Sequence, residues 1–270
     1  MFLKNVERIL SQLTPDDVVL DIGAWAAPFN RANYVVDINP YENRGVFGSY
    51  GPSKEYFSKD TWIVHDLSSC KPLPFKDKQF DFVICSHTLE DIRDPIKLCA
   101  EIARVGKRGY IEVPSRAAES TLGLEGKTYT GYLHHRWLIE LKGSELIFRA
   151  KPHLLHSNWK FCLPRWYAKK ITEEQKILVF FWQDSFQAKE VIVISPPLMA
   201  QEFEQFVRNA GVYPEWYYRA DELRPRKIAK RILLKYPALR KMVEKAIGCN
   251  LPLVQDKLEF WKNIKEIELR

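Results

Sequence analysis

The stretch V-V-L-D-I-G-A-W-A-A-P-F, residues Val18–Phe29, decides the fold of this chain. Its apolar first half is typical of a strand that is covered on both faces in a parallel sheet. Gly23 follows at once and allows a sharp turn with no Cβ between the backbone and a ligand. A second apolar run, Y-V-V-D, ends at Asp37, where a carboxylate is placed to accept hydrogen bonds from both hydroxyls of a ribose. The pattern therefore predicts a nucleotide-like cofactor at the edge of a parallel sheet.

The following residues extend this pattern through the first half of the chain. We expect a strand over 62–66, a strand over 80–86, a helix over 95–105 and a strand over 110–113. Strands that alternate with helical segments favour an α/β fold with a parallel sheet.

At this point the chain resembles the class I S-adenosylmethionine-dependent methyltransferases, over roughly residues 17–115. The motifs of that family stand in the correct order at Asp21, Gly23, Asp37, Asp66, Leu73–Phe75, Phe80, Asp81, His87, Leu89 and Glu90. The resemblance implies an enzyme that uses S-adenosylmethionine and releases S-adenosylhomocysteine. It also implies a Rossmann-like α/β fold, in which a mainly parallel seven-stranded sheet carries helices on both faces and its last strand is antiparallel.

The resemblance further implies which residues bind the cofactor. Asp21 and Gly23 would shape the cofactor loop, Asp37 would hold the ribose hydroxyls, and Asp66 with Leu67 would contact the adenine edge. The full expected set is Asp21, Gly23, Trp25, Asp37, Ile38, Asp66, Leu67 and Ser86.

The cofactor loop departs from the family in two ways. Trp25 and Ala27 stand where glycines are usual, and the segment before the second strand is too short for the usual first helix, which Pro28 also disfavours. Trp25 either packs on the cofactor, where its ring would favour a sulfonium cation, or fills the space of the missing helix. The same departure motivates an alternative hypothesis, an inactive methyltransferase-like scaffold or partner subunit.

The leading hypothesis is methyl transfer to a small-molecule or glycan acceptor, at oxygen. An alcohol or phenol must lose its proton as it attacks, and histidine is the side chain most readily poised for this near neutral pH. The candidate catalytic residues are His87, after the fourth strand, and His134 or His135, in a loop after the fifth. A hydrogen-bonded structural role is the alternative for each. Glu90 and Asp91 either orient such a histidine or cap the helix that follows.

Composition limits the class of protein. The 270 residues are 46% hydrophobic, which is ample for a packed core, and no apolar run approaches the roughly 18 residues of a membrane span. The N-terminal segment is expected to form an ordinary amphipathic helix and not a signal peptide, so the expected location is cytoplasmic. The five cysteines form no C-x-x-C pair, which favours reduced thiols over disulfides or a zinc site, and no metal site is expected.

The net charge of +7 lies entirely in residues 219–270, which hold 14 basic and 7 acidic side chains. We therefore expect a methyltransferase domain over 1–218 and a basic helical C-terminal extension over 219–270, divided into two helices at Pro237. Four roles are open for the basic segment over 224–270. It could associate with an anionic membrane, where a lipid-linked substrate would be methylated, or it could bind a phosphate-bearing substrate. It could also bind nucleic acid, or form a solvated face over a packed apolar stripe. The oligomeric state is left open.

The middle of the chain is expected to hold the acceptor. Residues 146–152 and 190–195 fit the last two strands of the sheet, which leaves an aromatic insertion over about 152–189. Its aromatic side chains either line a substrate pocket or partner surface, or form a helical subcore of their own. The tripeptide Asn39-Pro40-Tyr41 follows the wrong strand for a base-methylating enzyme, so a nucleic-acid substrate is not expected.

Overall fold

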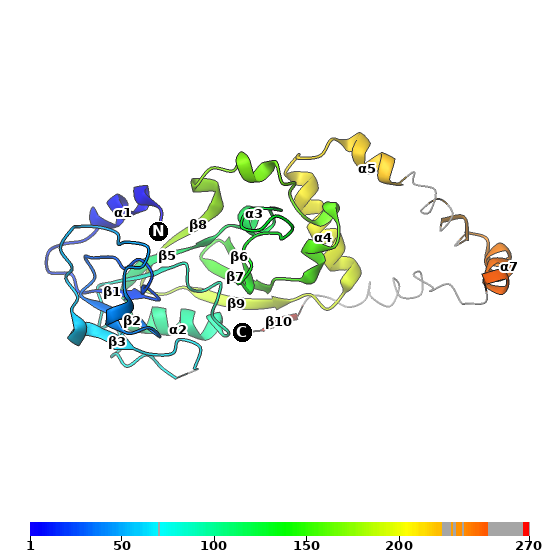
Figure 1. Cartoon of the computed structure of the whole chain (residues 1–270). Helices are drawn as coiled ribbons and strands as arrows, with labels where there is room; N and C mark the ends of the chain where they lie inside the picture. The colour runs from blue at the N-terminus through cyan, green and yellow to red at the C-terminus, as the bar shows by residue number, and fades with distance from the viewer. Residues whose placement is uncertain (70, 223–227, 229–230, 234, 248–266, 270) are drawn as a thin grey trace. The chain divides into compact units, whose positions relative to one another are not determined.

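The computed structural model describes residues 1–69, 71–222, 228, 231–233, 235–247 and 267–269 (Figure 1). These residues form two compact units. The first contains Met1–His153, Arg165–Ile192 and the described C-terminal residues from Glu268, and the second contains Leu154–Pro164 and the described residues of Val193–Ile267. The predicted domain boundary between residues 218 and 219 remains a prediction.

A six-stranded sheet forms the centre of the first unit, in the order β3-β2-β1-β4-β5-β8. The first five strands are parallel and β8 is antiparallel to β5, which confirms a mostly parallel sheet with an antiparallel last strand. The bounds are β1 (Val19–Ile22), β2 (Tyr34–Asp37), β3 (Trp62–Val64), β4 (Phe82–Ser86), β5 (Arg108–Pro114) and β8 (Ile177–Gln183). Strand order reverses between β1 and β4, the place where parallel sheets bind ligands.

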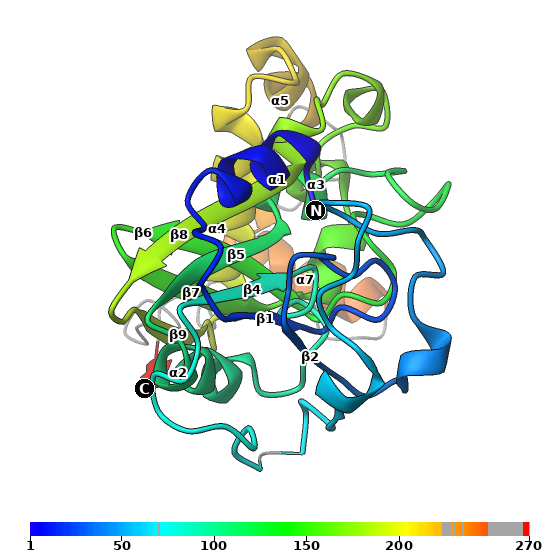
Figure 2. The ribbon, with the colours of Figure 1, turned by 90° about the vertical axis from the view of Figure 1, so that its left-hand side faces the viewer.

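Helices α1 (Leu3–Leu10) and α2 (Pro95–Val105) cover opposite faces of this sheet (Figure 2). Alternate residues of a strand point to opposite faces, and those of β1 divide accordingly between two cores. Val19 packs in the core that includes Ile9 of α1, whereas Leu20 packs in the core that includes Ile102 of α2. The predicted helix over 95–105 is confirmed. It begins at Pro95 and is capped by Asp94, whose side chain accepts a hydrogen bond from the Lys97 backbone N–H.

A second sheet corrects the predicted seven-stranded count. Its order is β10-β9-β7-β6, with β6 (Trp137–Lys142), β7 (Glu145–Ala150), β9 (Gln187–Ile192) and β10 (Ile267–Leu269). The two segments expected to finish the main sheet correspond to β7 and β9, and both lie in this second sheet. The antiparallel edge strand is β8, inside the expected insertion.

The aromatic side chains of β8 explain this difference. Phe180 and Trp182 are buried in the main core, and Trp182 pairs with Gly109 of β5, whose missing side chain leaves room for the indole. A strand that is apolar along most of its length carries no alternation to show which sheet it joins. The expected helical subcore is therefore wrong for this part of the insertion, which forms β8 and β9 in addition to short 3₁₀ turns.

The cofactor loop between β1 and β2 contains turns and no helix, as its length and Pro28 predict. In the second unit, α4 (Pro196–Asn209) and α5 (Glu215–Glu222) precede α7 (Pro237–Ile247), which begins at Pro237 as expected. A packed apolar stripe is one of the alternatives for this extension, and its apolar side chains are exposed at Ile228, Ile232, Leu239 and Met242. Most of the segment over 224–270 lies outside the described residues. None of the described helices is long and apolar enough to cross a membrane.

Candidate functional site

The carboxyl ends of β1, β2, β3 and β4 meet at one edge of the main sheet. The register pairs Ile22 with Val36 and with Cys85, so the loops that follow these strands leave the sheet side by side. Two sets of residues lie at this edge. We call Gly23, Asp37 and Asp66 the strand-end group, and His87, Asp91, His134 and His135 the histidine group.

Gly23 is required by its surroundings. Its φ angle is +74°, and its N–H donates to the Val36 carbonyl at 2.8 Å. A Cβ at this position would lie 2.2 Å from Oγ1 of Thr88, which is held under the turn by a hydrogen bond to the Ile22 carbonyl. The turn after β1 therefore depends on glycine for both its backbone conformation and its packing against Thr88, which follows β4.

Asp37 is buried at the end of β2, with 2% of its surface exposed. Its carboxylate accepts hydrogen bonds from the backbone N–H groups of Trp25 at 3.1 Å and Asn39 at 2.8 Å, and from the side-chain amide of Asn39 at 3.3 Å. Burial raises the pKa of Asp37 despite these donors. A carboxylate has about four lone-pair sites, so this group retains capacity for a ligand hydroxyl.

Asp21 lies deeper, within β1. Its carboxylate accepts a hydrogen bond from the Phe29 backbone N–H at 2.8 Å, which joins the strand to the far end of the cofactor loop. Burial raises the pKa of Asp21 to about 7. Asp21 and Ser86 do not line the pocket described next, and the Ser86 hydroxyl donates to Glu112 at 3.2 Å.

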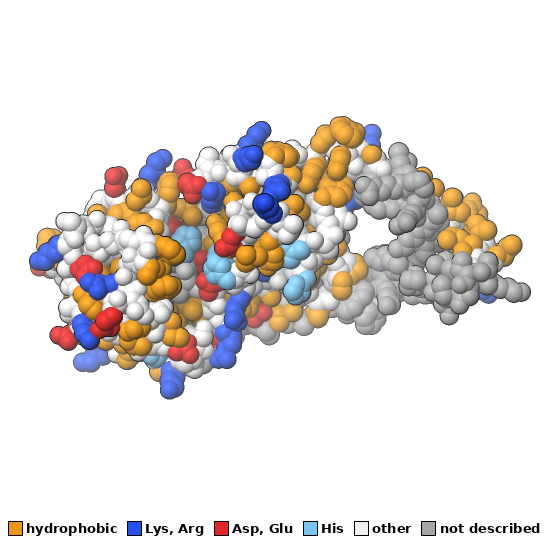
Figure 3. Space-filling model, viewed as in Figure 1, with side chains coloured by type: hydrophobic (Ala, Val, Ile, Leu, Met, Phe, Trp, Pro, Cys, Tyr) orange, Lys and Arg blue, Asp and Glu red, His pale blue; other side chains and the backbone are white. Residues whose placement is uncertain are grey.

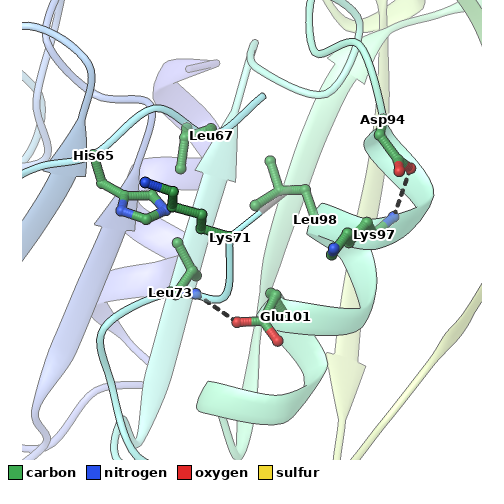
Figure 4. A pocket seen from close by; sticks show the side chains of 8 residues that line it. All are labelled: His65, Leu67, Lys71, Leu73, Asp94, Lys97, Leu98 and Glu101. Carbon is green, nitrogen blue, oxygen red and sulfur yellow. Dashed lines mark hydrogen bonds between the residues drawn. The ribbon is translucent and has the colours of Figure 1, made fainter. Parts of the chain in front are cut away.

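A pocket of about 210 Å³ opens at this edge of the sheet. It brings together six of the expected cofactor residues with His87. Its lining consists of Gly23, Trp25, Asp37, Ile38, Asp66, Leu67, Ser68, His87, Thr88, Asp91 and Ile92. A neighbouring pocket between His65 and α2 has a volume of only about 10 Å³ (Figure 4). That space is near the lower limit for one water molecule, so of these two pockets only the larger has room for a bigger ligand.

His87 is held between two acidic side chains. Its Nδ1 lies 3.2 Å from Oε1 of Glu90 and its Nε2 lies 3.1 Å from Oε1 of Glu112, both of which are buried. The φ angle of His87 is +53°, a left-handed conformation that histidine tolerates better than most residues.

The same contacts set the protonation of this pair. Partial burial disfavours the charged imidazole, but hydrogen bonds to Glu112 and Glu90 outweigh it and raise the pKa of His87 to about 9. Burial also opposes the charge on Glu112, yet hydrogen bonds from His87 and Tyr110 and the positive amino group of Met1 lower its pKa to about 2. At neutral pH both nitrogens of His87 carry protons, so it donates hydrogen bonds and has no lone pair with which to accept a proton. This geometry favours the structural alternative for His87.

His134 and His135 form the rest of the histidine group with Asp91. Nε2 of His134 lies 3.8 Å from Oδ2 of Asp91, and the two imidazole rings are 4.4 Å apart at their centroids. Nδ1 of His135 lies 2.5 Å from Oε1 of Glu119, a buried carboxylate at the end of α3 (Arg116–Glu119). Figure 3 shows histidine side chains with acidic side chains beside them on the face in view.

Two hydrogen bonds fix the segment before β6 against the segment after β4. The Arg136 N–H donates to the Glu90 carbonyl at 2.8 Å, and the Trp137 indole N–H donates to the Ile92 carbonyl at 2.8 Å. They bring two histidines to an aspartate from a distant part of the sequence.

Sequence reasoning missed several residues of the site. Thr88 under the glycine turn, Ser68 and Ile92 in the lining, and Glu119 behind His135 carry no motif. Glu112 did carry a signal, since it is an acidic residue inside the apolar run of β5. A buried carboxylate in such a position requires hydrogen-bond partners, which here are His87, Tyr110 and Ser86.

Comparison with family models agrees with the motifs. Residues 24–111, about a third of the chain, match the model of a family described as a methyltransferase domain. This match supports the enzyme class that the motifs predict, an S-adenosylmethionine-dependent methyltransferase. No curated protein sequence matches the chain.

Several solved structures are also similar. A complex between a Haloferax volcanii methyltransferase activator and a methyltransferase shows 21% identity and a TM-score of 0.31, covering 40% of this chain and 50% of that chain. The YcgJ protein of Bacillus subtilis shows 21% identity and a TM-score of 0.30, covering 42% of this chain and 51% of that chain. A methyltransferase of Methanosarcina mazei shows 19% identity and a TM-score of 0.32, covering 50% of this chain and 85% of that chain. The chain thus spans about half the length of the first two.

Proposed function

We propose that this protein transfers a methyl group from S-adenosylmethionine to an oxygen atom of a small-molecule or glycan acceptor. One observation carries the proposal: a single 210 Å³ pocket at the strand-order reversal is lined by the glycine turn, by Asp37 and by Asp66. The match to a methyltransferase domain, over residues 24–111, begins just after Gly23 and covers Asp37 and Asp66.

The residues of the pocket suit the parts of the cofactor. Asp37, at the end of β2, would accept hydrogen bonds from the ribose hydroxyls. Ile38 is 60% exposed and lines the pocket beside Leu67, so these two side chains offer apolar surface for the adenine ring, with Asp66 at its polar edge. When bound, S-adenosylmethionine supplies a methyl group that is activated by positive sulfur, and the chain supplies alignment and exclusion of water.

Trp25 fits the interpretation in which it packs on the cofactor. Its side chain lines the pocket and its backbone N–H donates to Asp37, so the loop is tied to the ribose position. The pocket stays open beside the indole, which favours an active enzyme over an inactive scaffold.

The acceptor would lie on the side of the histidine group. A hydroxyl acceptor must lose its proton, and His87 is already protonated at neutral pH. Asp91 lines the cofactor pocket and lies beside His134, with His135 next to both. We therefore assign the handling of the acceptor proton to this cluster.

Calorimetry with S-adenosylhomocysteine tests the cofactor site. The Asp37→Ala variant should bind on the order of 10- to 100-fold more weakly than the wild type, because a paired carboxylate contributes about 1.5 to 3 kcal/mol. The Asp60→Ala variant, changed at an exposed position, should bind as the wild type does.

The Ile38→Ala variant separates binding from folding. Its side chain is mostly exposed, so the fold should be unaffected while the apolar contact with adenine is lost. Equal affinity of the wild type, the Asp37→Ala variant and the Ile38→Ala variant would contradict the proposed site.

A second candidate function is methylation of a lipid-linked substrate at an anionic membrane surface. The observation that favours it is the exposure of Ile228, Ile232, Leu239 and Met242 within the basic extension. Co-sedimentation with anionic vesicles should be lost when residues 224–270 are deleted. Binding that survives the deletion would remove this candidate.

A further inference from the structure

Asp91, His134 and His135 form a group of metal-ligating side chains outside the cofactor residues. Each offers one ligand atom, and these atoms lie within 4.8 Å of one another. Ligands that share one ion at bond lengths of about 2.0 to 2.2 Å lie roughly 3 to 3.5 Å apart. His134 is 61% exposed, so a modest turn of its ring closes the difference.

His135 is oriented as a metal ligand usually is. The Glu119 carboxylate engages Nδ1, which leaves the Nε2 lone pair to bind an ion. Glu119 is itself fixed by Lys151, whose Nζ lies 2.7 Å from Oε2 of Glu119 and donates to the Tyr132 carbonyl at 2.8 Å. A buried carboxylate with a compensating lysine thus stands behind one imidazole, an arrangement that costs desolvation energy and serves to orient a ligand.

Asp91 supplies an independent observation. Its Oδ1 is buried and has no hydrogen-bond partner among the described residues. A buried carboxylate oxygen without a donor is unfavourable, and a cation would satisfy it. The hydrogen bonds from Arg136 and Trp137 to the chain around Asp91 keep the histidines close to this carboxylate, whose Oδ2 lies 3.8 Å from Nε2 of His134.

We propose that Asp91, His134 and His135 bind a first-row transition-metal dication. Two imidazoles and one carboxylate suit Zn²⁺, Fe²⁺ or Co²⁺, whereas Mg²⁺ and Ca²⁺ take oxygen ligands. Three protein ligands leave a coordination position open, as in catalytic sites. Because Asp91 also lines the cofactor pocket, an acceptor hydroxyl could take that position, where the ion would ease the loss of its proton to water. This use of the ion rests on the proposed methyl transfer; binding of the ion does not.

Calorimetric titration of the untagged, chelator-treated full chain with Zn²⁺ tests the site. We expect one Zn²⁺ per chain, and binding on the order of 100-fold weaker in the Asp91→Asn and His134→Ala variants. The Glu119→Gln variant should bind Zn²⁺ about 10- to 100-fold more weakly, since Glu119 positions His135 and does not touch the ion. The His153→Ala variant is the matched control, because it removes an exposed histidine outside the cluster and should bind as the wild type does. Mg²⁺ should not compete.

The S-adenosylhomocysteine titration, run on the same samples, separates the two proposals and reports on folding. Variants that bind S-adenosylhomocysteine normally but lose Zn²⁺ support the metal site. Wild type that binds S-adenosylhomocysteine but no stoichiometric Zn²⁺ overturns the metal site and leaves the methyltransferase intact. Zinc binding that is equal in the His134→Ala and His153→Ala variants also overturns it. Stoichiometric Zn²⁺ without S-adenosylhomocysteine supports the metal site and contradicts the proposed function.

Discussion

The strand-end group and the histidine group lie at the same edge of the sheet but are held in different ways. Asp37 is fixed by backbone N–H groups of its own neighbourhood, Trp25 and Asn39. His87 and His135 are fixed by side chains, the buried carboxylates of Glu112 in β5 and Glu119 in α3. The positions of the first group are set by the local backbone, whereas the positions of the second are set by ion pairs between separate elements.

This difference predicts how each group responds to change. A group held by backbone donors should be sensitive to backbone conformation. A group held by charged partners should lose stability when a partner is removed and should respond to pH. The predictions below test this contrast, from the largest expected effect to the smallest.

Removal of Glu112 should have the largest effect. The Glu112→Ala change leaves the backbone N–H of Phe2, the hydroxyls of Tyr110 and Ser86 and the charged His87 without their shared acceptor. Breaking a buried ion pair costs about 3 to 5 kcal/mol, and we expect the lower end because His87 is 41% exposed. Chemical denaturation measures this loss in the free energy of unfolding.

The Glu145→Ala variant is the control for that measurement. It breaks the partly exposed pair of Glu145 and Lys189 in the second sheet, where the loss should stay within about 1 kcal/mol. Losses of similar size in the two variants would show that the histidine group does not depend on its buried carboxylate.

The Gly23→Ala change should affect the strand-end group through the backbone. A side chain at φ +74° costs about 1 to 3 kcal/mol, and the new Cβ would also clash with Thr88. We expect lower stability and loss of detectable S-adenosylhomocysteine binding. The Gly143→Ala variant is matched, since its φ is +63° and no atom lies within 4 Å of the added Cβ. It should lose some stability but keep cofactor affinity, and equal affinities in the two variants would refute the role of the glycine turn.

The same contrast explains what could be predicted from the sequence. Strands β1, β2 and β4 and the turn at Gly23 were predictable because apolar runs that end in Asp or Gly are local patterns. The strand-end group followed from them. The histidine group was predictable only as separate residues, because its assembly depends on the β6–β7 hairpin, on Glu119 and on the hydrogen bonds from Arg136 and Trp137. Strand β8 was misassigned for a related reason, since its apolar side chains fit the edge of either sheet.

The smallest expected effect is the pH dependence of the histidine group. The folded protein raises the pKa of His87 from 6.5 to about 9, so the stabilisation from its charge is fully present below pH 6.5 and is lost as the pH rises through 9. The pKa of Glu112 is lowered from 4.5 to about 2, so its contribution is present above pH 4.5 and is lost as the pH falls through 2. The pair is therefore most stabilising between about pH 4.5 and 6.5.

The His87→Asn variant should reveal this window, because asparagine also tolerates a positive φ. The difference in unfolding free energy between wild type and variant should be largest near pH 6 and should shrink toward pH 10. Solvent screening at the exposed part of His87 keeps the difference small. The His153→Asn variant controls for the loss of an exposed histidine. If the difference in unfolding free energy instead grows from pH 6 to pH 10, His87 is neutral in the folded protein. His87 would then again be a candidate proton acceptor beside the pocket.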